Sequence, residues 1–403
     1  MTGREGNALI VCFLLMLTSD FWLLTSVKTT KGDRVMRRKV LVSAIGLLAV
    51  LFMGVACATA EEKAAAAVQS LPKTAGKTAD MTKPVKVFIL LGQSNMVGMG
   101  KIGPADKDGT LENAVKSKKK YTYLVDEAGN WTERNDVRFV RYMSGKGPLN
   151  NEWMTVKTCR TIGPEFGIGH ELGNAIDAPV MILKVCIGNR SLGWDLLPPG
   201  SERFVEGDKV YAGYKDKPDS WAVDPAKGKA TVPPPFLDKK GNPINWYAGL
   251  QYDGDTADAK KALADLEKHY PGAKGFDVAG FFLWQGEKDA GNAVHAAHYE
   301  QNLVNFIKSL RKDFNALDAK FVIATMGESV KGSKGNGGMV LDAQLAVDGT
   351  SGKHPEFKGN VATIYSNPMA QGGSGNSHYG GKAEVYMDVG EAMGKAMAEM
   401  LKK

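Results

Sequence analysis

Short apolar runs alternate with amphipathic stretches along most of this chain. The apolar runs end at glycine or polar residues and predict buried strands at 85–91, 180–187, 278–284, 321–326 and 361–365. Between them, apolar residues at helical spacing predict helices at 165–176, 256–269, 295–311 and 382–401. Strands that alternate with helices are typical of a parallel sheet covered on both faces. The predicted fold class is therefore α/β.

Polar residues follow three of these strands, where an open α/β sheet binds its ligands. The first strand runs into Gly92, Gln93 and Ser94, so Ser94 is a candidate nucleophile, although a serine there also serves as a helix cap. The third strand ends at Gln285, Gly286 and Glu287. An amide there can donate to developing negative charge, and a carboxylate can orient an imidazole.

Gly188 follows the second strand, and its N–H is a candidate donor to an oxyanion. Among six histidines, His378 lies in a glycine-rich loop before the last helix, at the same edge of the sheet. His295 and His298 are three residues apart and lack the spacing of the usual zinc helix, so we predict solvated positions and no metal site.

The first 60 residues have the pattern of an export signal. A basic segment starts at Met36, an apolar run covers 40–55, and small residues precede Glu61. We predict a signal peptide at 36–60 and a secreted or periplasmic protein, with a retained membrane anchor as the alternative. Because this signal begins at its own methionine, residues 1–35 are predicted to be a wrongly assigned extension. Residues 61–83 are predicted to be a flexible linker.

Charge and cysteine usage exclude some classes of protein. The formal net charge is +7, but residues 1–60 hold seven Lys or Arg against three Asp or Glu, so the remainder is close to neutral. This excludes a nucleic-acid partner on electrostatic grounds. After processing, Cys159 and Cys186 remain; they could pair in an exported protein, but Cys186 lies in an apolar run typical of a buried thiol.

A segment rich in Pro, Gly, Lys and Asp, residues 196–245, interrupts the alternation of strands and helices and predicts a long functional loop. Its aromatic side chains could stack on sugar rings, or they could pack the loop onto the domain. These side chains are Phe204, Tyr211, Tyr214, Trp221 and Phe236.

Two motifs together resemble a known family. Gly92-Gln93-Ser94-Asn95-Met96 and Trp284-Gln285-Gly286-Glu287 are similar to signatures of the sialate O-acetylesterase and acetylxylan esterase group of the SGNH-hydrolase superfamily. The histidine loop before the closing helix resembles a third. The resemblance covers the predicted domain at 84–403. It implies a three-layer α/β/α flavodoxin-like SGNH-hydrolase fold with a parallel central sheet.

The resemblance also implies metal-free and cofactor-free hydrolysis of acetyl esters on carbohydrate. Ser94 would be the nucleophile and His378 the general base, with the oxyanion held by Ser94, Gly188 and Gln285. Many relatives place an aspartate three residues before the histidine, but this chain has Gly375 there. Some relatives use the glutamate of the second motif instead, so the resemblance implies Glu287 as the orienting acid. Asp289 is the second candidate, and a backbone carbonyl or a water molecule could also orient His378. The alternative function is a non-catalytic carbohydrate-binding relative.

Overall fold

The computed structural model describes residues 77–143, 147–370 and 377–402. The predicted extension at 1–35 and the predicted signal peptide at 36–60 lie outside the described residues, as does most of the predicted linker. The last part of that linker is described and contacts the domain. Lys77 Nζ donates to the Gly173 carbonyl at 2.7 Å, and Thr78 bridges to Asn135.

A seven-stranded sheet forms the centre of the domain, in the order β12-β11-β10-β1-β6-β3-β4. All neighbours are parallel except β3 and β4, which pair antiparallel at one edge. The predicted α/β class with a parallel sheet is confirmed. The strands are β1 (Val85–Gly92), β3 (Glu133–Tyr142), β4 (Pro148–Thr155), β6 (Val180–Val185), β10 (Phe276–Trp284), β11 (Lys320–Ala324) and β12 (Val361–Ile364).

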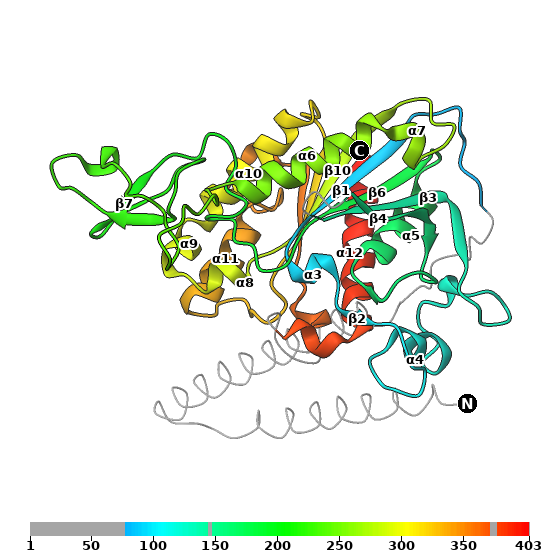
Figure 1. Ribbon diagram of the computed structural model, residues 1–403. Helices are drawn as coiled ribbons and strands as arrows, with labels where there is room; N and C mark the ends of the chain where they lie inside the picture. Colours follow the sequence, from blue (N-terminus) through cyan, green and yellow to red (C-terminus); the bar gives the residue numbers. More distant parts are fainter. Residues whose placement is uncertain (1–76, 144–146, 371–376, 403) are drawn as a thin grey trace, which may run out of the picture. The chain divides into compact units, whose positions relative to one another are not determined.

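Helices cover both faces of the sheet (Figure 1). Successive side chains of β1 enter opposite hydrophobic cores, with Phe88 and Leu90 in one and Val87 and Ile89 in the other. The first core packs against α5 (Glu165–Ala175) and α12 (Ala383–Leu401). The second packs against α6 (Leu250–Ala264), α10 (Tyr299–Asp313) and α11 (Gly335–Ala346).

Short elements connect these layers. The helices among them are α3 (Ser94–Val97), α4 (Leu111–Lys116), α7 (Leu266–His269), α8 (Glu287–Ala290) and α9 (Ala293–Ala297). Strands β2 (Gly100–Lys101) and β5 (Thr161–Ile162) pair with each other. The 3-10 turns are η1 (Thr122–Leu124), η2 (Gly228–Ala230), η3 (Pro355–Phe357), η4 (Asn367–Met369) and η5 (His378–Gly381). No helix of the described residues is long and apolar enough to span a bilayer.

The predicted loop at 196–245 is partly regular. It contains a three-stranded antiparallel sheet of β7 (Phe204–Glu206), β8 (Lys209–Tyr211) and β9 (Ser220–Ala222), which projects to one side in Figure 1. Trp221 is buried in the small core of this sheet. Strands of three residues are too short to show an alternating pattern, which is why the sequence predicted only a loop.

Candidate active site

Ser94 lies on a sharp turn between β1 and α3. Gly92 has φ 144°, and a Cβ at this position would lie 2.2 Å from the carbonyl oxygen of Trp284 on β10. Only glycine fits this turn without moving the neighbouring strand. Ser94 is half-buried, whereas Gln93 and Asn95 on either side of it are buried. The turn therefore presents one hydroxyl to solvent beyond the end of the sheet.

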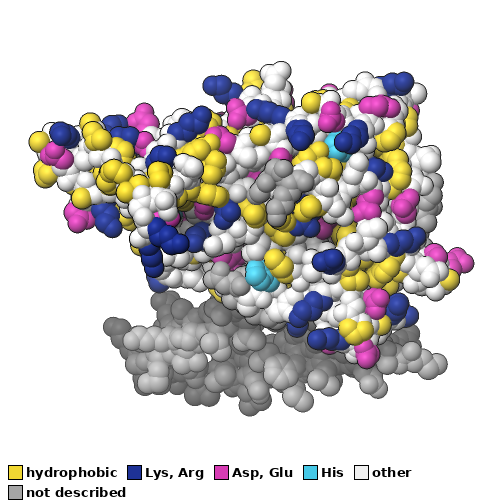
Figure 2. Space-filling view, in the orientation of Figure 1, with side chains coloured by type: hydrophobic (Ala, Val, Ile, Leu, Met, Phe, Trp, Pro, Cys, Tyr) yellow, Lys and Arg dark blue, Asp and Glu magenta, His cyan; other side chains and the backbone are white. Residues whose placement is uncertain are grey.

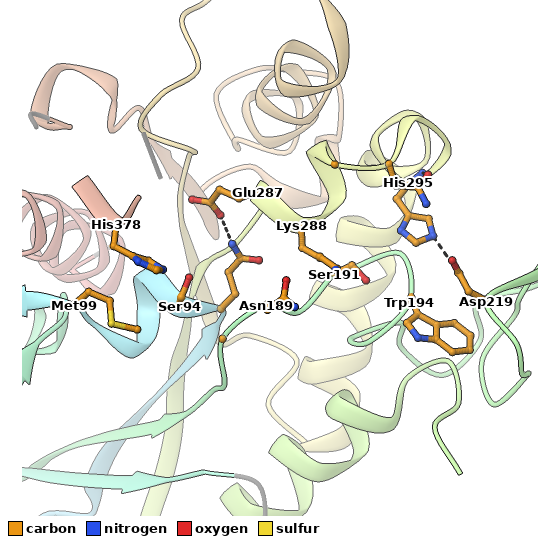
Figure 3. Close-up of a pocket in the computed structure, with 14 residues that line it drawn as sticks. Ser94, Met99, Asn189, Ser191, Trp194, Asp219, Glu287, Lys288, His295 and His378 are labelled. Atoms are coloured by element: carbon orange, nitrogen blue, oxygen red, sulfur yellow. Dashed lines mark hydrogen bonds and ion pairs between the residues drawn. The ribbon is translucent and has the colours of Figure 1, made fainter. Parts of the chain in front are cut away.

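Ser94 opens into a pocket of about 720 Å³ at the carboxyl ends of β1, β6 and β10. Four of the predicted site residues line it, namely Ser94, Gly188, Glu287 and His378. Figure 3 shows His378 and Ser94 at one end, with the imidazole turned toward the serine hydroxyl. Residues 94 and 378, near opposite ends of the domain's sequence, thus meet in one cavity.

The backbone around His378 is held in an unusual conformation. His378 and Tyr379 have φ of 53° and 51°, in the left-handed region that residues other than glycine rarely adopt. The Tyr379 ring stacks on Trp284 with centroids 5.9 Å apart, and its hydroxyl accepts the Gly327 N–H at 3.1 Å. The Tyr386 hydroxyl donates to the His378 carbonyl at 3.3 Å. These contacts offset a backbone cost on the order of 1 kcal/mol per strained residue and fix the imidazole over the pocket.

Glu287 does not orient His378 as predicted. Its Oε2 accepts from Gln93 Nε2 at 2.5 Å, and its Oε1 accepts from Asn95 Nδ2 at 2.6 Å. No hydrogen bond joins the His378 imidazole to any residue that the structure describes. Gly286, with φ 155°, turns the chain so that Glu287 lies under the serine turn. Glu287 therefore fixes both neighbours of the nucleophile, and is a positioning residue.

The Glu287 carboxyl is poised to titrate near neutral pH. Burial raises its pKa to about 7, the nearby Glu328 and Asp289 also raise it, and the hydrogen bond from Asn95 opposes the shift. Because the folded pKa lies above the usual value of 4.5, the folded protein binds this proton more tightly than the unfolded chain does. Its contribution to stability is present below pH 4.5 and is lost as the pH rises through about 7.

We expect Glu287→Gln to flatten this pH dependence. The variant has no ionisable group to desolvate, so its free energy of unfolding, relative to the wild type, rises between pH 5 and pH 8 by at most ~3 kcal/mol. Chemical denaturation at several pH values measures this difference. Parallel stability curves for the two proteins would contradict the proposed titration.

Gln285 is not placed to act as the predicted oxyanion donor. Its side chain is fully buried and does not line the pocket. Nε2 donates to the Arg190 carbonyl at 2.9 Å and to Asp289 Oδ2 at 2.6 Å, while Oε1 accepts from the Tyr299 hydroxyl at 2.8 Å. Both N–H groups are thus committed, and neither is free for a substrate oxygen.

Asp289, the reserve candidate for the acid, supports a different loop. It accepts from the backbone N–H groups of Leu192 and Gly193, both at 2.8 Å, and from Gln285. Together Gln285 and Asp289 hold the segment that follows β6. Their effect on the site is to place Gly188 and Asn189 beside the serine.

The oxyanion donors that the geometry supports are backbone groups. A Cβ on Gly188 would lie 3.5 Å from the Ser94 Cβ, so the two backbones approach closely. Within the described residues, neither the Ser94 N–H nor the Gly188 N–H donates a hydrogen bond. Asn189, which the sequence analysis did not single out, also lines the pocket. Its position directly after Gly188, beyond the end of β6, could have identified it as a site residue from the sequence.

A histidine and aspartate pair lies at the other end of the pocket (Figure 3). His295 Nε2 is 3.1 Å from Asp219 Oδ1, and His295 is only 6% exposed, so the predicted solvated position is wrong. Burial opposes its charge, but the Asp219 carboxylate outweighs burial and raises its pKa. His298 instead stacks on Phe204.

Neither the histidines nor the cysteines form a metal site in the described parts of the chain. There, no group of three or more His, Cys, Asp or Glu side chains is placed to hold an ion. Cys159 and Cys186 are both free thiols, and burial raises the pKa of each to about 12.

A serine on the turn after a central strand and a histidine from the last loop face one pocket in an α/β/α domain, which is the arrangement of a serine hydrolase. Residues 240–399 match the family model described as "Carbohydrate esterase, sialic acid-specific acetylesterase". This match confirms the predicted resemblance to that family over these residues. The protein is a carbohydrate acetylesterase. The matched range contains Glu287 and His378, whereas Ser94 lies upstream of it.

Several solved structures are similar to this chain. A protein from Arabidopsis thaliana is 13% identical, with a TM-score of 0.44 over 79% of this chain and 99% of that one. A carbohydrate acetylesterase from Xanthomonas citri is also 13% identical, with a TM-score of 0.43 over 77% of this chain and 55% of that one. NanS, again 13% identical, has a TM-score of 0.31 over 61% and 69%. No curated protein matches the sequence.

Proposed function

We propose that this esterase removes acetyl groups from sugars through an acyl-enzyme on Ser94, with His378 as general base. The observation that carries this proposal is the meeting of Ser94, His378 and the Gly188 backbone in one pocket. Nucleophile, base and oxyanion donor are the three groups that acyl transfer needs.

The reaction has two steps, formation of an acetyl-serine and its hydrolysis. The Ser94 Oγ attacks the acetyl carbonyl, His378 takes the hydroxyl proton, and the same proton passes to the departing sugar oxygen. Water then attacks the acetyl-serine, gives a proton to His378, and acetate leaves as the proton returns to Ser94. The N–H groups of Ser94 and Gly188 stabilise the negative oxygen in both steps, each by about 3 kcal/mol.

Glu287 supports this reaction through the serine turn. Its carboxylate binds the side chains of Gln93 and Asn95, which flank the nucleophile. A pair of short hydrogen bonds to one carboxyl group limits the motion of the turn and so keeps the Ser94 hydroxyl within reach of His378.

Acetate release from 4-nitrophenyl acetate and from acetylated xylan tests the proposal. Release from both substrates that depends on Ser94 supports a polysaccharide acetylesterase. Release from the small ester alone would support the serine esterase mechanism and indicate that the substrate is another acetylated glycan. No release from either substrate would favour the non-catalytic carbohydrate-binding relative.

We further propose that the enzyme acts outside the cytoplasm. The support is the basic and apolar pattern at 36–60, and an acetylated glycan of the cell exterior would be a matching substrate. N-terminal sequencing of the exported protein should find a start close to residue 61. An unprocessed chain in the membrane fraction would indicate the retained anchor instead.

A further inference from the structure

The active-site pocket continues into a second hollow of about 330 Å³. Three residues line both cavities, Asn189, Trp194 and Lys288. In Figure 3, Trp194 and Lys288 lie away from the His378 end of the pocket, beyond Ser94. The second hollow therefore extends the catalytic pocket at the side where the alcohol part of an ester can lie. Its volume is within the range of small-molecule binding sites.

Three aromatic side chains contribute to the lining of this second hollow. Trp194, Phe236 and Trp246 are all half-buried there. Trp246 Nε1 is buried, so the accessible part of the indole is its carbon surface. A short hairpin presents two of these rings, since Ile244 N–H donates to the Phe236 carbonyl at 2.8 Å and Leu237 bridges to Pro243. Aromatic carbon surface of this kind is what the apolar face of a sugar ring packs against.

Two cationic side chains, Arg190 and Lys288, lie beside these aromatic rings. The Arg190 guanidinium lies over the Trp246 ring at 4.7 Å, and its Nε donates to Gln251 Oε1 at 3.0 Å. Within the described residues, neither Arg190 nor Lys288 has an acidic partner in an ion pair. The carboxylate in the lining, Asp195, is committed to the N–H and hydroxyl of Ser191. The hollow thus offers hydrogen-bond donors beside aromatic rings.

We propose that this second hollow, lined by Arg190, Trp194, Phe236, Trp246 and Lys288, binds the sugar residue next to the acetylated one. The substrate is then a glycan chain of at least two sugars. This inference rests on the proposed function, because the acetylated sugar must lie at Ser94. Binding of a remote sugar residue helps to hold the ester at the serine and so raises kcat/KM for chains over single sugars.

Acetylated oligosaccharides of increasing length test the proposal on the full-length enzyme. The substrates are acetylated xylose and its oligomers, acetylated galacturonic acid and its oligomers, and 4-nitrophenyl acetate. For wild type, we expect kcat/KM to rise about tenfold from the single sugar to the oligomer of one series. In Trp246→Ala and Phe236→Ala, we expect this gain to shrink relative to each variant's own rate on 4-nitrophenyl acetate.

Phe276→Ala is the matched control. Phe276 is an exposed aromatic residue at the start of β10, the end of the strand away from the pocket. It should keep the full gain with chain length, and Trp246→Phe should restore part of it. Activity on 4-nitrophenyl acetate without a length gain on either series would overturn this inference and leave the esterase assignment intact. A length gain that both alanine variants retain would also overturn it, whereas no activity on any ester would overturn the proposed function itself.

Discussion

Ser94→Ala is expected to reduce kcat for acetate release on the order of 10⁵-fold or more on every ester. The hydroxyl is the atom that forms the acyl-enzyme, and no other group in the pocket replaces it without a new base arrangement. Ser94 is half-buried, and its hydroxyl makes no hydrogen bond to the residues that the structure describes, so the thermal unfolding temperature should be nearly unchanged. Acetate assay and calorimetry on the same preparation measure both quantities.

Ser191→Ala is the matched control for that result. Ser191 also lines the pocket, but its hydroxyl is bonded to Asp195 at 3.0 Å and supports the loop after β6. We expect this variant to retain activity within about tenfold, as for the loss of two structural hydrogen bonds, since the hydroxyl also accepts the Asp195 N–H at 3.3 Å. An equal loss of activity in the two variants would mean that any change in the pocket impairs catalysis, and Ser94 would not be identified as the nucleophile.

The central strands and the serine turn could be predicted because they depend on local sequence. The apolar run that became β1 is buried on both faces, and Gly92 marks the close approach to β10. Strand β3, which lies between β6 and the edge strand β4, was missed because charged residues interrupt its apolar positions. Arg134 in β3 is buried, and its charge is paired with Asp136 at 2.7 Å. Such burial depends on a partner and not on hydropathy.

The hydrogen-bond partners of the second motif, Trp284-Gln285-Gly286-Glu287, could not be predicted, because they depend on turn geometry. The sequence placed Gln285 and Glu287 at the correct edge of the sheet. Gln285, however, points into the protein toward Tyr299, whereas Glu287 follows a glycine with φ 155° and lies under Ser94. Chain spacing does not say which direction each side chain takes beyond a strand end. The motif is therefore a scaffold for two loops, and its residues act on the substrate indirectly.

The long loop shows the same limit for aromatic residues. Of the five that were considered, Trp221 packs in the core of the β7–β9 sheet, and Phe236 lines the second hollow. Trp246, which also lines the second hollow, directly follows the predicted loop and was not considered. Which ring packs and which ring faces a ligand depends on the hairpin that joins Phe236 to Ile244, a contact that composition does not reveal.

His378→Ala is expected to match Ser94→Ala in severity, and the double variant should be no worse than either single one. Nucleophile and base act as a unit, so removal of one leaves the other without its role. Steady-state rates on 4-nitrophenyl acetate measure all three variants. The test is sharp in this protein because the pocket holds a second histidine, His295, which already has a carboxylate partner in Asp219.

His295→Ala therefore decides between two possible bases. His378 lacks a hydrogen-bonded acid among the described residues, but in Figure 3 it is turned toward Ser94, whereas His295 lies at the far end of the cavity. General-base catalysis requires the base within hydrogen-bond reach of the proton that it takes, and the orienting acid only improves it. We expect His295→Ala to keep activity on the small ester within about tenfold. If His295→Ala is the variant that abolishes turnover and His378→Ala is not, the base is the His295–Asp219 pair and the pocket must rearrange to bring it to Ser94.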